Sequence, residues 1–270
     1  MKKLLIALFL LLSIACVTVS ACADEQVTLK DVNSTDTYIA KTVRRARICG
    51  EGLNDHYKVQ QGSATDGTYG YFLLESKVTW KCALVKVNLE DFSIVDIKYD
   101  LPVDHGNDMT YNARINKLVV VHNKPHYNWV SLIDPDTLEI VETKELTVNM
   151  FSIGYCEERD QYIVGLSGSQ NFSILDSEFN ESKFCPVEHT TYVTQGADCD
   201  DKYVYFPQWD DTSDKNYIRV FDWDGNLVNT IQVKAMNEIE SMFHVGDRVV
   251  LSFYAALGVV YDATILRVAE

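Results

Sequence analysis

Short apolar or alternating runs, separated by turn-forming residues, follow one another along most of the chain. Four of these runs end in an acidic or amide turn, which begins at Asn88, Asp134, Asp176 and Asp222. These turns lie 46, 42 and 46 residues apart. A period of about 40 to 50 residues, built from short strands, is typical of the four-stranded blades of a β-propeller. Helical solenoids share the period but lack the β-branched and aromatic content seen here.

The chain also repeats itself directly. Residues 61–72 (QGSATDGTYGYF) align without a gap with residues 195–206 (QGADCDDKYVYF), which keeps Gln, Gly, Asp and three aromatic positions in register. Residues 108–120 align in the same way with residues 152–164, at an offset of 44. Each match covers one strand, a turn and the next strand, so the repeating unit is a set of short antiparallel strands.

This template predicts one all-β domain over residues 41–270, with five units at about 59–99, 102–146, 147–187, 192–233 and 238–268. The last unit is one strand short. An open ring would leave an unpaired sheet edge, so the missing strand is expected from the segment before the first unit, such as Lys41 to Ile48. We therefore predict a five-bladed β-propeller that an N-terminal strand closes.

The N-terminus has the pattern of an export signal. Lys2 and Lys3 precede an apolar run up to Val19, which predicts a signal peptide over residues 1–21. Val19-Ser20-Ala21-Cys22 resembles a bacterial lipobox and predicts lipidation of Cys22, whereas an ordinary cleavage before Asp24 would release the protein. We expect an extracytoplasmic protein, either lipid-anchored or secreted, with the polar residues 22–40 as its tether.

Charge and cysteine content narrow the list of partners. The formal net charge is −15, and removal of the leader with its two lysines makes it −17. Such a surface repels nucleic acid and anionic lipid, so the lipid is the only expected membrane contact, and we expect a monomer. Cys49, Cys82, Cys156, Cys185 and Cys199 show no zinc-binding spacing. Disulfides Cys156–Cys185 and Cys82–Cys199 are one alternative, and buried free thiols are the other.

Three resemblances bear on the fold and the site. The patterning of residues 59–268 resembles the broad YVTN, NHL and SMP-30-like propeller group, which implies the fold. The first unit resembles the opening blade of plant-type glutaminyl cyclases through Gln61-Gly62, Leu73-Leu74-Glu75-Ser76 and Leu84 to Leu89, which implies that Glu75 lies by an active site. It departs from that family at Ser63 and over residues 77–80. Residues 105–112 resemble a signature of uncharacterised exported propellers of Gram-positive bacteria.

Candidate site residues follow from the propeller template, because inner strands line a channel and begin at one mouth. The expected ligand-binding residues at these starts are Gln61, Asn107, Gln195 and Glu240. Asp108 and Glu240 offer hard oxygen ligands that suit Ca²⁺. The weaker catalytic candidates are Glu75 and a pair of His105 with Asp108. Neighbouring polar positions are Ser152, Gln208, Ser241 and His122. The alternative is structural, since such side chains satisfy backbone groups and channel water.

Aromatic residues follow several second strands, where they could stack on sugar rings or pack between blades: Trp80, Tyr127, Trp129 and Trp209. The Asp222-Trp223-Asp224-Gly225 segment is interpreted as a hairpin turn, because its glycine comes too early for a calcium loop. The chain has no nucleophile elbow, P-loop or dinucleotide fingerprint.

These observations favour a surface binding module that takes a glycan, a peptide or another small molecule at the channel mouth. A glutaminyl-cyclase-like or lactonase-like enzyme is the alternative, and a purely structural scaffold is the third class.

Overall fold

The computed structural model describes residues 23–48, 53, 56–254 and 258–269. The expected signal peptide, Cys22 and Cys49 lie outside this part of the chain, so cleavage and lipidation stay predictions. No helix in the described ranges has the length and hydrophobicity needed to cross a bilayer.

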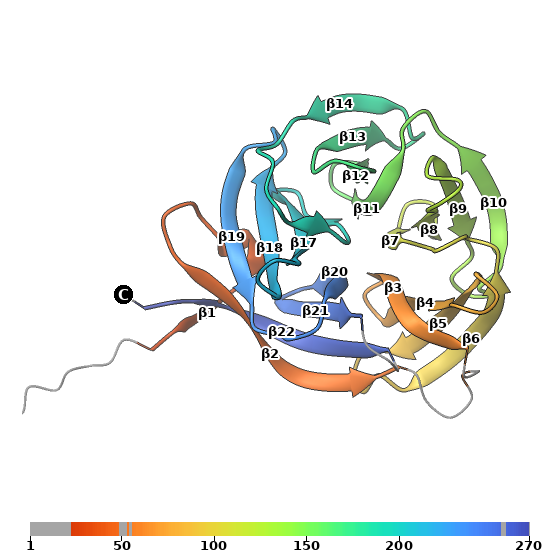
Figure 1. Ribbon diagram of the computed structural model, residues 1–270, viewed down its shortest axis with the longest axis horizontal. Helices are drawn as coiled ribbons and strands as arrows, with labels where there is room; N and C mark the ends of the chain where they lie inside the picture. The colour runs from red at the N-terminus through yellow and green to blue at the C-terminus, as the bar shows by residue number, and fades with distance from the viewer. Residues whose placement is uncertain (1–22, 49–52, 54–55, 255–257, 270) are drawn as a thin grey trace, which may run out of the picture.

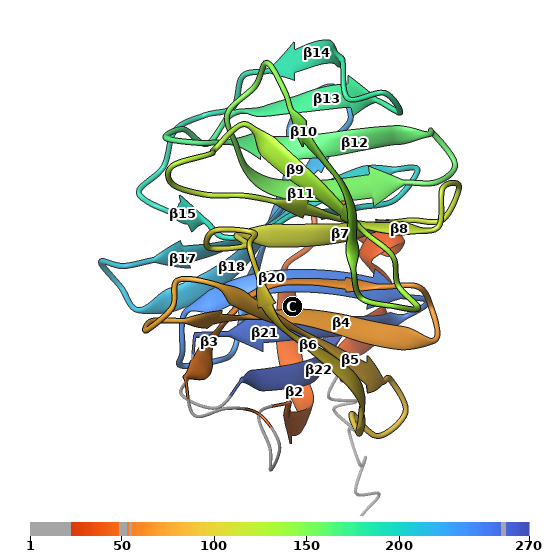
Figure 2. The ribbon, with the colours of Figure 1, turned by 90° about the vertical axis from the view of Figure 1, so that its right-hand side faces the viewer.

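The strands form five blades, the last two of which belong to one continuous sheet. Figure 1 shows the blades around a central axis. Blade 1 contains β3 (Tyr57–Thr65), β4 (Tyr69–Ser76), β5 (Cys82–Asn88) and β6 (Ile94–Leu101). Blade 2 contains β7 (Asp108–Asn112), β8 (Lys117–Val121), β9 (Trp129–Ile133) and β10 (Ile140–Glu145). Blade 3 contains β11 (Met150–Cys156), β12 (Gln161–Leu166), β13 (Phe172–Asp176) and β14 (Glu181–Cys185). From the side, the strands run from one face of the ring to the other (Figure 2).

Blade 4 has a divided inner strand. Its two short pieces, β15 (Val193–Thr194) and β16 (Asp198–Cys199), both pair with β17 (Tyr203–Asp210). The blade continues outward through β18 (Lys215–Asp222) and β19 (Leu227–Val233). The interruption contains Gly196, where the chain passes close to the next blade.

Blade 5 is completed by the N-terminal strand, which confirms the predicted closure. It contains β20 (Ile239–Val245), β21 (Arg248–Phe253) and β22 (Val259–Arg267), and its outer strand is β2 (Tyr38–Arg47). β2 pairs antiparallel with β22 along nearly its whole length. It also pairs in parallel with β19 at two positions, which joins blades 4 and 5 into one sheet.

The expected tether is built into the ring instead of hanging free, which corrects the prediction for residues 25–40. β1 (Glu25–Val27) pairs with β22, and the short 3₁₀ helix η1 (Leu29–Asp31) follows it. Val27, Leu29 and Val32 are buried in the core shared by blades 4 and 5. These three apolar residues in a polar stretch are enough to anchor it, because burying each side chain stabilises the packed form.

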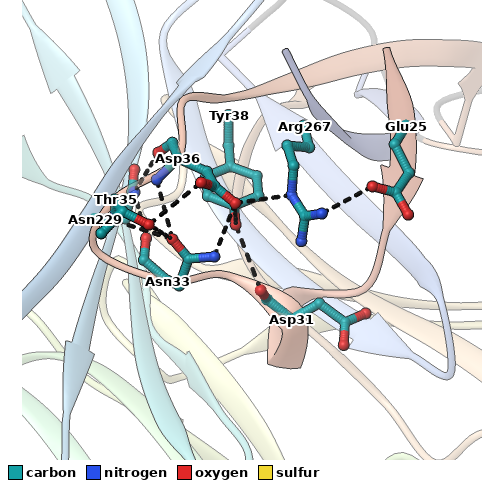
Figure 3. A network of polar contacts seen from close by, with 8 residues as sticks. All are labelled: Glu25, Asp31, Asn33, Thr35, Asp36, Tyr38, Asn229 and Arg267. Carbon is teal, nitrogen blue, oxygen red and sulfur yellow. Dashed lines mark hydrogen bonds and ion pairs between the residues drawn. The ribbon is translucent and has the colours of Figure 1, made fainter. Parts of the chain in front are cut away.

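A polar network fastens the same segment on its outer side, as Figure 3 shows. Asn229 of blade 4 donates hydrogen bonds to the carbonyl oxygens of Asn33 (2.6 Å) and Asp36 (3.0 Å). Arg267 of β22 forms ion pairs with Glu25 (2.8 Å) and Asp36 (2.9 Å). The segment therefore bridges blades 4 and 5 where the ring closes.

The aligned repeats form the same local structure. Asp66 accepts the N–H groups of Thr68 and Tyr69 and the hydroxyl of Tyr71. Asp200 does the same with the N–H groups of Lys202 and Tyr203 and the hydroxyl of Tyr205. The repeated Asp therefore fixes the turn after an inner strand and ties it to the next strand, a structural role for this part of the motif.

The four described cysteines, Cys82, Cys156, Cys185 and Cys199, are buried free thiols, so the disulfide alternative is wrong for both suggested pairs. Cys82 packs between blades 1 and 2, and Cys199 packs between blades 3 and 4, which keeps that pair apart. Burial raises the pKa of each thiol, that of Cys156 to about 11. The thiols act as small apolar core residues.

Candidate functional site

The inner strands contact one another at one level of the ring, here called the waist, where Gly62, Asp108, Ile153, Ala197 and Ser241 lie. A Cβ atom on Gly62 would lie 2.5 Å from the Cα atom of Asp108, so only glycine allows β3 and β7 to approach this closely. On the other side, the Ser241 hydroxyl donates to the carbonyl oxygen of Gln61 (3.0 Å). The waist separates an upper mouth, where inner strands begin, from a lower mouth.

Asp108 ties three blades together at the waist. Its side chain is fully buried, and its Oδ2 atom accepts the N–H of Ile153 (2.9 Å) and the N–H of Ala197 (2.9 Å). Oδ1 has no hydrogen-bond partner among the described residues. Burial raises the pKa of Asp108 well above its ordinary value, although the N–H donors oppose that shift. Asp108 therefore links blades 2, 3 and 4 from a position inside the ring.

We expect Asp108→Ala to lower the free energy of unfolding by about 2–4 kcal/mol, because two buried N–H groups lose their acceptor. Asp108→Asn keeps an acceptor oxygen and is expected to be near wild type at pH 7. Because the pKa of Asp108 is raised in the folded protein, the folded chain binds a proton at this carboxyl group more tightly than the unfolded chain does. The contribution of Asp108 to the free energy of unfolding therefore falls as pH rises above about 4, the ordinary pKa of an aspartate. In Asp108→Asn this part of the pH dependence should vanish.

Urea denaturation of the three proteins between pH 4 and pH 8 measures both effects. If the asparagine variant unfolds as readily as the alanine variant, the carboxylate itself is required and the hydrogen-bonding account is wrong.

The upper mouth contains a buried carboxylate held by a histidine and a lysine. The Glu75 side chain is only 2% exposed, its Oε1 lies 2.7 Å from Nδ1 of His105, and its Oε2 forms an ion pair with Lys77. Burial opposes ionisation of Glu75, but the hydrogen bonds from His105 and Lys77 outweigh it, and the net effect lowers the pKa. His105 thus pairs with Glu75 and not, as the sequence suggested, with Asp108.

A second acid–histidine cluster joins the loop that enters blade 2, which carries Asp104, to the loop between β8 and β9, which carries His122 and His126. Oδ2 of Asp104 is 2.8 Å from Nδ1 of His122 and 3.0 Å from Nδ1 of His126. His122 also contacts the Ser131 hydroxyl, and burial lowers its pKa. His126 stacks on Trp129 with ring centroids 3.8 Å apart. These contacts fix the position of the segment from His122 to His126 at the upper mouth.

A cavity of about 520 Å³ opens between these clusters. Its lining residues are Glu75, Trp80, Asp104, His105, Asn123, Lys124, Pro125 and Tyr127. The Trp80 side chain lies at this cavity and is 64% exposed, whereas Trp129 is engaged by His126. The cavity therefore combines an aromatic ring, a carboxylate–imidazole pair and an amide side chain, the mixture that ligand sites use for orientation and specificity.

The four expected ligand-binding residues are not gathered in this cavity. Asn107 donates to the Phe151 carbonyl oxygen (2.6 Å) and accepts from Asn123 (2.7 Å). Gln195 donates to Glu238 (2.5 Å), and the Gln61 backbone accepts from Ser241. The side chains of Gln61 and Glu240 have no hydrogen bond or ion pair to the described residues. The side chains of Asn107 and Gln195 thus satisfy groups of neighbouring blades.

Within the described ranges, no three His, Cys, Asp or Glu side chains are grouped so that they could hold a metal ion. Asp108 uses Oδ2 for backbone groups, and Glu240 lies on another blade. The expected Ca²⁺ site at these two residues therefore gains no support from the arrangement of the side chains.

The lower mouth holds a pair that the sequence analysis missed. Nδ1 of His244 lies 2.6 Å from Oδ2 of Asp198, in a polar cavity of about 130 Å³ that all five inner strands line. Burial opposes protonation of His244, but the charge of Asp198 outweighs it and raises the pKa. Equivalent positions in the other repeats carry no matching histidine, so repeat alignment gave no signal. Asp104 and Asn123 were missed because they lie in irregular loops.

Comparisons with known proteins show the fold alone. No family model matches the chain, and no curated protein does. The structure is similar to regucalcin from Agrobacterium tumefaciens, described as a calcium-binding protein, with a TM-score of 0.55 and 10% identity over 85% of this chain and 96% of that one. Hydrazine synthase from Kuenenia stuttgartiensis aligns with a TM-score of 0.45 and 9% identity over 76% and 58%. The strand pairing and the similarity to regucalcin together show an all-β propeller, and the strand pairing gives it five blades.

Proposed function

We propose that this protein is an exported surface binding module whose ligand, a glycan or a peptide, occupies the cavity at the upper mouth. The observation that carries the proposal is the exposed Trp80 ring beside a cavity that also presents the Glu75–His105 pair. An aromatic ring beside hydrogen-bonding groups in one cavity gives a ligand both a surface to stack on and groups that fix its orientation. The N-terminal pattern supports placing this surface outside the membrane.

An enzyme at the same cavity is the second candidate, because the carboxylate of Glu75 and the imidazole of His105 lie at hydrogen-bond distance and such a pair can transfer a proton. The resemblance of the first blade to plant-type glutaminyl cyclases, and the fold it shares with regucalcin, make cyclase-like and lactonase-like reactions the ones to assay. Turnover of a glutamine-terminated peptide or a lactone that disappears in Glu75→Gln would establish this candidate over simple binding.

We expect Trp80→Ala to weaken ligand binding about tenfold to a hundredfold, because stacking on an aromatic ring contributes about 1–3 kcal/mol when the ring is covered. Phe184→Ala is the matched control, since Phe184 is an exposed aromatic residue on the outer strand of blade 3. Ligands are first selected from glycan and peptide arrays, and affinities are then measured by titration calorimetry. Equal losses in both variants, or none in either, would place the site elsewhere.

A further inference from the structure

Glu240 is a buried carboxyl group that the described chain leaves without a partner. Its side chain is 6% exposed, and no hydrogen bond or ion pair joins it to a described residue. Burial, together with the charges of Glu238 and Glu75, raises its pKa, whereas the charge of Lys77 opposes the rise. A lone buried carboxyl group is unfavourable and is compensated when a cation or a hydrogen-bond donor reaches it.

Glu240 belongs to the upper mouth. It lies at the start of the inner strand β20, which packs beside β3 at the centre of the ring (Figure 1). The next residue, Ser241, donates its hydroxyl to the carbonyl oxygen of Gln61 (3.0 Å), which holds this part of β20 against blade 1, the blade that carries Glu75 and Lys77. Glu238, half-buried two residues earlier, also has a raised pKa, chiefly through burial. Glu238 accepts a hydrogen bond from Gln195, so Glu240 and Glu75 are the two carboxyl groups that adjacent blades bring to this end of the ring, where Lys77 supplies an ammonium group.

Lys77 shows which chemistry the mouth accepts. Its ammonium group pairs with Glu75 and lies 5.7 Å from the centroid of the Trp80 ring. A cation between a carboxylate and the face of an indole gains from both the charge and the ring quadrupole. The Lys77 side chain is 47% exposed and comes from a surface loop, so it can be displaced at little cost. It occupies the position that a ligand cation would take.

We propose that the upper mouth recognises a positively charged side chain of a peptide, the ammonium of lysine or the guanidinium of arginine, with Glu240 and Glu75 as anionic partners and Trp80 as the aromatic face. This inference rests on the proposed binding function and selects its peptide form over the glycan form. The incoming cation neutralises Glu240 and competes with Lys77 for Glu75. The excess of acidic residues, with a net charge of −15, draws such a peptide toward the surface.

The test uses the mature protein and three blocked tripeptides, acetyl-Gly-Lys-Gly-amide, acetyl-Gly-Arg-Gly-amide and acetyl-Gly-Gln-Gly-amide, with chito-oligosaccharides as the glycan probe. Binding is followed by tryptophan fluorescence and by calorimetry at low and high salt. The Lys and Arg peptides are expected to bind, more weakly as salt rises, and the Gln peptide at least about tenfold more weakly.

Two variants should change affinity in opposite directions. Glu240→Gln removes the anionic partner and is expected to reduce affinity for the Lys peptide about tenfold or more. Lys77→Met removes the competing cation and is expected to raise that affinity about threefold. Lys144→Met is the control for net charge, because Lys144 is exposed on the outer strand of blade 2. Thermal unfolding of each variant shows that the fold is intact.

The outcomes separate the two proposals. Binding of the glycan or of the Gln peptide that is indifferent to Glu240→Gln would overturn the cation proposal and leave the binding function standing. Loss of affinity in Lys77→Met would also overturn it, since Lys77 would then be a ligand-binding group. Binding of no probe from either class would overturn both.

Discussion

A mature chain that lacks residues 23–47 is expected to lose its cooperative unfolding transition. This deletion removes β2, the outer strand of blade 5, and exposes the edge of β22 along its whole length. It also removes buried side chains of the core between blades 4 and 5, namely Val27, Leu29, Val32 and Tyr38. At about 1.5–3 kcal/mol for each large apolar side chain, their loss approaches the entire stability of an ordinary domain, about 5–15 kcal/mol.

Circular dichroism and urea denaturation measure this loss. A shorter deletion and a synthetic peptide serve as the controls. A shorter deletion of residues 23–26 removes most of β1 and the Glu25–Arg267 ion pair but leaves the buried anchors, so it should retain cooperative unfolding with a small loss. A synthetic peptide of residues 27–48 should restore structure to the long deletion when added in trans. A cooperative transition in the long deletion without the peptide would show that blade 5 stands without β2.

The fold could be predicted because the same pattern of short strands and turn residues recurs in several blades. Turn residues such as Asp66 and Asp200 recur at equivalent positions, and each binds its turn in the same way. Even the closing strand was deducible, because a missing strand in the last unit requires a donor. The docking of residues 25–37 was not, because three apolar residues among polar neighbours give no periodic pattern. Their burial depends on a groove that exists only once the ring has closed.

The site was predicted only in part. Glu75 and His105 were candidates, and the structure pairs them with each other in a cavity beside Trp80. Asp108 does not join the other candidates at the mouth for a physical reason: Gly62 lets the backbones of β3 and β7 touch, and the Asp108 side chain then accepts backbone N–H groups of blades 3 and 4. Loop residues that wall the cavity, such as Asn123, carry no strand pattern, so their position depends on tertiary contacts that a single sequence does not reveal.

Gly62→Ala is expected to destabilise the ring more than a Gly→Ala substitution at any other described glycine. The new Cβ atom would lie 2.5 Å from Cα of Asp108 and 2.7 Å from the Met109 nitrogen, both backbone atoms that cannot turn aside as a side chain does. Overpacking of this kind costs about 1–3 kcal/mol or more, and here it also strains the Asp108 hydrogen bonds that join three blades.

Gly67→Ala is the matched comparison, because Gly67 adopts φ = +89° in a turn with open space around it. Its expected cost is about 1 kcal/mol, from backbone strain alone. Urea denaturation of the two variants should therefore rank Gly62→Ala well below Gly67→Ala in stability. The reverse order would mean that blades 1 and 2 can separate at little cost, and that the ring derives its rigidity from the packed cores between its blades more than from contacts at the waist.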